Sequence, residues 1–252
     1  MATSPKQRPF VLDPLFRSVR GLPGIGPKLA KNLERLVGGE TLRDLLFHKP
    51  IEIINRKVAA SITDLPAGQT GSLVLKVERH TPNPRRSIPY RVDTQDNAGH
   101  VLTLVFFHAH RDYIQKILPI GEEVLISGRI ENYQGKRQMT HPDYILPLSE
   151  KDQIPEIEPV YPMTQGLTGK TLTKAISAAL EQVPDLPEWL DNALLTKQKW
   201  PNWKQAIQEL HRPKDGAALS ADNPARQRLA YDELLSSQLA LALLRHHTKT
   251  TH

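Results

Sequence analysis

The hydrophobic period of this chain changes twice, and this change limits what the chain can fold into. Between residues 27 and 37, the apolar residues Leu29, Leu33 and Leu36 recur with helical spacing. From about residue 57 the period becomes two, as in the run Ser72–Glu78, and after residue 168 it becomes helical again. A segment whose apolar residues have helical spacing does not form a stable strand. The sequence therefore predicts an α+β protein with helices at both ends and strands between them.

The N-terminal segment, residues 1–56, is predicted to form short helices. Asp13 is expected to cap the first helix and Thr41 the last. Between them, the run from Gly24 to Gly26 has the form of a helix-hairpin-helix corner. Glycines let a backbone approach a DNA phosphate closely at a helix N-terminus, where Lys28 would add positive charge. The alternative is a structural corner whose glycines only supply turn geometry.

The central segment, residues 57–147, shows five strand patterns and one helix. Strands are expected at 72–78, 90–94, 100–107, 123–130 and 137–145, and a helix at about 109–118. Three strands, a helix and two strands are the order of an OB-fold, a five-stranded barrel. Other small β-barrels share parts of this order.

The last segment, residues 148–252, begins with an extended stretch and continues with helices. Prolines at positions 147, 155, 159 and 162 exclude a regular helix up to about residue 168. Helices are expected at 171–182, from 186, at 203–210 and at 224–245. The sequence thus predicts three consecutive domains.

The formal net charge of +6 is unevenly distributed. Residues 1–56 carry ten basic and five acidic side chains, whereas the other two segments are nearly balanced. A localised basic segment favours a polyanionic partner such as nucleic acid, although many such clusters are only solvated surface. The absence of cysteine excludes disulfides, thiol nucleophiles and cysteine-ligated metals. No apolar run approaches the ~18 residues of a membrane span, so a cytoplasmic protein without a membrane partner is expected.

Aromatic residues concentrate in the predicted barrel, where six of the 14 lie between residues 90 and 144. Phe106 and Phe107 are adjacent, so strict alternation would bury one and expose the other. OB-folds stack bases on such side chains, while basic loops hold the backbone. Arg85 and Arg86 lie in the first hairpin loop, and Lys136 with Arg137 in the last turn, where those loops are expected. Three tyrosines are instead expected in the core: Tyr90, Tyr113 and Tyr144.

Two further motifs carry no predicted chemistry. Gly169-Lys170-Thr171 resembles the end of a phosphate-binding loop, but Thr164 stands where the first glycine of that motif is needed. His108 and His110 are spaced like metal ligands, yet no further ligand is evident. We therefore predict no catalytic residue, no cofactor site and no metal site in this chain.

Seven motifs occur here in the order found in one protein family. They are residues 22–28 (LPGIGPK), 42–50 (LRDLLFHKP), 104–107 (LVFF), 140–144 (THPDY), 159–167 (PVYPMTQGL), 210–213 (LHRP) and 225–235 (ARQRLAYDELL). Together they resemble the N-terminal part of RecG, the ATP-dependent DNA helicase that remodels stalled replication forks and Holliday junctions in repair and recombination. The resemblance covers about residues 15–245.

The resemblance implies that the barrel is a wedge domain, which splits the parental duplex and stacks aromatics on unpaired bases. Phe106 and Phe107 match the wedge aromatics of the family, whereas Arg85, Arg86 and Lys136 match only by loop position. The implied partners are branched DNA, meaning forks and junctions with single-stranded character, and a separately encoded motor domain. ATP and Mg²⁺ are expected only in that motor, and the protein is expected at the nucleoid.

Two departures from the family accompany this likeness. After Lys49-Pro50 the family shows a basic pair, then tyrosine, aspartate and arginine, of which this chain keeps only Arg56. The chain also stops at His252 before any motor motif, so it is expected to be inactive as an ATPase on its own. The alternative functions are a stand-alone OB-fold that binds single-stranded nucleic acid, or a protein-interaction module that uses the apolar face of the last helix.

Overall fold

The computed structural model describes residues 8–250 except 83–84, 86–87 and 109. The contacts between residues divide the chain into two compact units. Unit 1 combines residues 1–53 with 159–252, and unit 2 comprises residues 54–158. The chain passes between the units along β1 (Glu52–Asn55) and β10 (Ile157–Val160), which pair in a two-stranded sheet.

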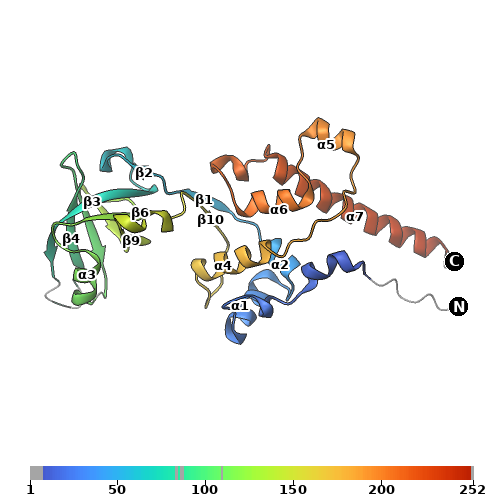
Figure 1. Cartoon of the computed structure of the whole chain (residues 1–252), viewed down its shortest axis with the longest axis horizontal. Coiled ribbons are helices and arrows are strands. Elements are labelled where there is room, and N and C mark those ends of the chain that lie inside the picture. The colour runs from blue at the N-terminus through green and yellow to red at the C-terminus, as the bar shows by residue number, and fades with distance from the viewer. Residues whose placement is uncertain (1–7, 83–84, 86–87, 109, 251–252) are drawn as a thin grey trace. The chain divides into compact units, whose positions relative to one another are not determined.

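Unit 1 is helical, with helices from both of its chain segments (Figure 1), and residues of both segments share one apolar core. Its helices are η1 (Phe10–Phe16), η2 (Val19–Gly21), α1 (Pro27–Val37), α2 (Leu42–Leu46), α4 (Gly169–Leu180), α5 (Asn192–Gln198), α6 (Trp203–His211), η5 (Gly216–Leu219) and α7 (Pro224–Thr250). One buried apolar cluster joins Leu33 of α1 and Leu45 of α2 to Ile176 of α4, Ile207 of α6 and Leu229 of α7. Segments 1–56 and 148–252, predicted as separate domains, therefore share a core, because an amphipathic pattern shows which face is buried but not its partner.

The helix ends of unit 1 follow the sequence only in part. As predicted, Thr41 caps α2: its hydroxyl accepts from the N–H of Asp44 at 3.3 Å, and the Asp44 carboxylate accepts from the N–H of Thr41 at 3.1 Å. The predicted cap at Asp13 is wrong, since η1 begins after Pro9. The helix predicted from residue 186 is also wrong, because α5 begins only after its cap Asp191.

Unit 2 is built on a sheet of eight strands, with α3 (Arg111–Ile117) across one end (Figure 1). The strands are β2 (Val58–Ala59), β3 (Thr70–Thr81), β4 (Tyr90–Gln95), β5 (Val101–Phe106), β6 (Glu123–Arg129), β7 (Glu131–Tyr133), β8 (Lys136–Thr140) and β9 (Tyr144–Pro147). The hydrogen-bonded order is β7-β8-β5-β4-β3-β6-β9, with β2 beside β3. Alternate residues of β4 face the core, namely Tyr90, Val92 and Thr94, as the period of two predicts.

The predicted fifth strand, 137–145, is divided in the structure. β8 pairs with β5 in parallel and β9 pairs with β6 antiparallel, and the division falls at His141, where φ is +46°. Pro142 follows and cannot donate to a ladder, which is the physical reason for the interruption. The strand order is that of an OB-fold, but the described strands form no closed ring of pairs. A closed barrel therefore stays a prediction.

Candidate nucleic-acid interface

The two adjacent phenylalanines at the end of β5 have different environments. Phe106 is only 6% exposed and belongs to the apolar core of unit 2. Phe107 is 46% exposed, so its ring is available to a ligand. The predicted alternation is therefore confirmed. The prediction that Phe106 stacks on a base is wrong, because its ring is packed in the core.

His141 lies beside both rings. Its Nε2 accepts a hydrogen bond from the main-chain N–H of Phe107 at 3.1 Å. The imidazole meets the Phe106 ring edge-on at 6.1 Å between centroids, and it lies 5.8 Å from the Phe107 ring at a 35° tilt. No sequence pattern indicates this contact, since 34 residues separate Phe107 from His141.

A tight hairpin carries the basic pair of the last turn. Gln134 and Gly135 both have positive φ, +51° and +76°, as a two-residue type I′ turn between β7 and β8 requires. Lys136 is exposed and forms no ion pair within the described residues. Arg137 instead donates to the carbonyl oxygens of Ile62 and, at 2.9 Å, Leu65. Arg137 therefore holds the hairpin to the unit through Nη1, and its role in DNA binding stays a prediction.

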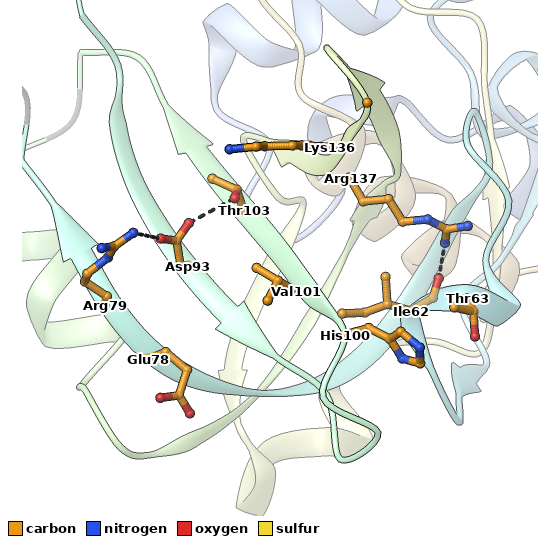
Figure 2. A pocket seen from close by; sticks show the side chains of 11 residues that line it. Ile62, Thr63, Glu78, Arg79, Asp93, His100, Val101, Thr103, Lys136 and Arg137 are labelled. Carbon is orange, nitrogen blue, oxygen red and sulfur yellow. Dashed lines mark hydrogen bonds and ion pairs between the residues drawn. The ribbon is translucent and has the colours of Figure 1, made fainter.

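An open hollow of about 700 Å³ lies beneath this hairpin (Figure 2). Lys136 and Arg137 border it from the hairpin, while Arg79, Asp93 and Thr103 line it from β3, β4 and β5. Asp93 accepts from Arg79 at 2.7 Å and from the Thr103 hydroxyl at 3.0 Å. This is the face between the second and third barrel strands and the last loop, where OB-folds bind oligonucleotides.

The loop between β3 and β4 is described only in part. Arg85 is exposed, as a backbone contact requires, and Arg86 lies outside the described residues. Of the three tyrosines expected in the core, Tyr90 is fully buried and Tyr144 half-buried, but Tyr113 is 62% exposed. Placing Tyr113 in the core was wrong, because Ile114 is the residue of α3 that turns inward.

The corner before α1 offers an open backbone to a ligand. Gly24 has φ +74°, and Gly26 forms the N-cap of α1 without any side-chain cap. A Cβ built at either glycine would meet no atom of the described residues within 4 Å beyond its chain neighbours, so this side of the backbone is open. Lys28 is exposed on the first turn. The first arm of the corner is the three-residue η2, which is shorter than a helix-hairpin-helix normally has.

Three motifs of unit 1 meet in a buried stack of rings. Tyr161 lies between His48, at 6.1 Å, and His211, at 5.7 Å, measured between ring centroids. Nε2 of His211 donates to the Leu46 carbonyl at 2.8 Å, so its Nδ1 accepts from the Tyr161 hydroxyl at 3.0 Å. Nε2 of His48 lies 2.9 Å from the carbonyl oxygen of Pro162. These residues tie together three segments of unit 1 that are far apart in the sequence.

Arg56, the family position that the chain keeps, is also structural. Its side chain is 4% exposed, pairs with Glu158 and Asp143, and donates to the Ser127 hydroxyl at 3.0 Å. The Tyr144 ring lies 5.0 Å from the guanidinium. Arg56 therefore fastens β6, the β8–β9 connection and β10 at one point of unit 2.

The run Gly169-Lys170-Thr171 forms an ordinary helix start. Gly169 starts α4, and the Thr168 hydroxyl caps it by accepting from Thr171 at 3.2 Å. His, Asp and Glu side chains form no group of three fit for a metal ion in the part of the chain that the structure describes. Nor does any described helix combine the length and apolarity that crossing a bilayer would need.

Unit 2 thus defines a class of domain: an OB-type strand order with exposed aromatics, Phe107 among them, and an open face bordered by a basic turn. The family model of the RecG wedge domain matches residues 19–183, and this chain belongs to that family. The resemblance predicted from the seven motifs is confirmed.

Individual relatives agree with the family. The ATP-dependent DNA helicase RecG of Thermotoga maritima is 32% identical over 88% of this chain, and that of Aquifex aeolicus is 28% identical over 85%. A solved structure of RecG bound to a three-way DNA junction is 28% identical, covers 92% of this chain and superposes with a TM-score of 0.70. The chain spans about a third of the length of these relatives, 28% for the two sequences and 32% for the structure.

Proposed function

We propose that this chain is the branched-DNA-binding wedge region of a RecG-type helicase. The observation that carries the proposal is the exposed Phe107, which is anchored at the end of β5, the strand that also lines the open face through Val101 and Thr103. Single strands bind to such domains by stacking, at roughly 1–3 kcal/mol per base. An unpaired base at a branch point would therefore gain a contact that a linear duplex cannot offer.

Phosphate binding supplies the rest of the affinity. Lys136 and Arg85 are exposed in unit 2, and Lys28 with the open backbone at Gly26 is exposed in unit 1. Contacts of this kind are blind to sequence and position the duplex, whereas stacking at the branch selects its shape. The relatives are named ATP-dependent helicases, and we propose that ATP and Mg²⁺ act in the part of their length that this chain does not span.

The test compares four DNA ligands at one fixed salt concentration: a fork, a three-way junction, a single strand and a linear duplex of equal length. The proposal expects the fork and the junction to bind at least about fivefold more tightly than the linear duplex. Tightest binding of the single strand would favour the alternative, a stand-alone single-strand-binding domain. Equal affinity for all four would reject both, since phosphate contacts alone do not distinguish shapes.

A second function, docking of a separately encoded motor domain, is favoured by α7. Five of its leucines are between 46% and 71% exposed: Leu234, Leu239, Leu241, Leu243 and Leu244. A hollow of about 260 Å³ lies beside the helix, lined by Phe47, Trp189 and Leu239. The test is titration with the ATP-hydrolysing part of a RecG relative, followed by tryptophan fluorescence. Binding that Leu239→Lys abolishes supports docking, and a flat titration contradicts it.

A further inference from the structure

We propose that His141 is the positioning residue of the wedge: its imidazole holds Phe107 in the orientation that receives an unpaired base. The proposal rests on the proposed function, because it concerns the same stacking residue. His141 itself need not touch DNA, and its effect is exerted through Phe107.

The need for such a residue follows from where the sheet ends. The last pair between β4 and β5 is Tyr90 with Phe106, and the last pair between β5 and β8 is Val105 with Thr140. The main-chain N–H of Phe107 therefore lies beyond both neighbouring strands and has no ladder partner. Without another acceptor, the exposed Phe107 ring would be carried by a backbone segment that the sheet does not restrain.

His141, the residue that follows β8, supplies that acceptor. Its own N–H donates to the Val105 carbonyl at 2.9 Å, and at φ +46° the backbone then leaves the line of β8. The side chain returns to β5, where Nε2 accepts from the N–H of Phe107 at 3.1 Å. A neutral imidazole with the proton on Nδ1 is required for this, since an N–H at Nε2 would oppose the donor.

The same ring also restrains the two phenyl rings. It meets Phe106 edge-on and lies tilted beside Phe107, with centroids 6.1 and 5.8 Å apart. Because Phe106 is 6% exposed and belongs to the core, His141 ties the exposed ring to a fixed point. One imidazole thus restrains both the backbone and the side chain of Phe107.

The connection that carries His141 is in turn held by a buried charge. Asp143, two residues on, accepts from Arg56 at 2.9 Å, and that guanidinium is 4% exposed. The connection between β8 and β9 is therefore anchored on both sides, at Val105 and at Arg56. Fixing a side chain before binding removes an ordering cost, so loss of His141 should weaken fork binding by about three- to tenfold.

The experiment measures the ratio of fork affinity to linear-duplex affinity for two variants of His141. His141→Phe keeps a ring and removes the acceptor, whereas His141→Gln removes the ring and keeps an acceptor oxygen at a similar reach. We expect His141→Phe to lower the ratio about three- to tenfold and His141→Gln to restore part of it. His110→Phe makes the same exchange at an exposed residue of the neighbouring loop, and it should leave the ratio unchanged.

Two further readouts separate positioning from mere support of the fold. In Phe107→Ala, adding His141→Phe should lower the ratio no further, because the residue being positioned is gone. In the intact chain, NMR should show a coupling across the hydrogen bond between the Phe107 amide and Nε2 of His141. A ratio unaffected by His141→Phe, while Phe107→Ala lowers it, would overturn the positioning role alone. A ratio unaffected by Phe107→Ala would instead reject the proposed function.

Discussion

The hydroxyl of Tyr161 donates to Nδ1 of His211 across 3.0 Å, in the core of unit 1. Burial lowers the pKa of His211 to about 4, which keeps the imidazole neutral and able to accept this bond. Burial also raises the pKa of Tyr161 above its ordinary value. The pair joins the segment after β10 to α6, and so connects parts of the chain that are 50 residues apart.

This pair predicts how the stability of unit 1 depends on pH. The unfolded chain binds a proton at His211 below the ordinary pKa of about 6.5, while the folded chain binds it only near 4. Stability is therefore complete above pH 6.5 and falls by up to about 3 kcal/mol as the pH drops to 4. Urea unfolding across this range should show the fall, and His211→Gln should flatten it. Parallel curves for the two proteins would contradict the assignment.

Substitution of the buried arginine in α7 is predicted to cause a large loss of stability. Arg228 has a fully buried side chain that donates to both carboxylate oxygens of Glu188, at 2.8 and 2.9 Å, and to Asp232 at 2.9 Å. Arg228→Ala removes the positive charge that both carboxylates share and should cost about 3–5 kcal/mol in urea unfolding. Arg245→Ala, at an exposed position of the same helix, should cost less than about 0.5 kcal/mol. Equal effects of the two substitutions would refute the buried pairing.

The two glycines before α1 should respond differently to substitution. Gly24→Ala places a side chain at φ +74° and should cost roughly 1–2 kcal/mol of stability. Gly26→Ala meets neither positive φ nor any nearby atom, so the fold should tolerate it. If a phosphate approaches this backbone, Gly26→Ala nevertheless weakens DNA binding severalfold in a gel-shift titration. Unchanged DNA affinity would mean that the corner is only structural.

Substitution of Lys28 is predicted to change the salt dependence of DNA binding. If it contacts a phosphate, Lys28→Ala should weaken fork and linear DNA alike and reduce the slope of log K against log salt by about 0.9. Lys197→Ala, at an exposed residue of α5, serves as the control with equal loss of charge. Identical slopes for the two variants would show that Lys28 makes no phosphate contact.

The period of the sequence predicted the strands of unit 2 well, because burial on one face leaves a local trace. β4 shows this most clearly, with Tyr90 and Val92 inside and Arg91 and Asp93 outside. The division of the last predicted strand into β8 and β9 is not visible in the hydrophobic period, since it depends on the backbone turn at His141. The exposure of Tyr113 was missed for a similar reason: it is adjacent to the buried Ile114, and in a two-turn helix the inward face is decided by packing.

A local sequence pattern does not show which distant residue a side chain will contact. The predicted helix from residue 186 fails because the Glu188 carboxylate accepts from Trp189 and Leu190 and also binds Arg228, 40 residues away. For the candidate site, the sequence indicated the exposed Phe107, but it did not indicate that the Arg137 guanidinium also donates to main-chain carbonyls. Charge alone does not tell a phosphate contact from an internal hydrogen bond.

The most direct test of the account is the ratio of fork affinity to linear-duplex affinity in Phe107→Ala. Phe10→Ala is the matched control, because Phe10 is 78% exposed and lies in unit 1. With the salt concentration held fixed, we predict that Phe107→Ala loses roughly five- to a hundredfold in fork affinity. Its linear-duplex affinity should stay unchanged, and Phe10→Ala should match the wild type for both ligands. Equal fork preference in the wild type and Phe107→Ala would contradict the account.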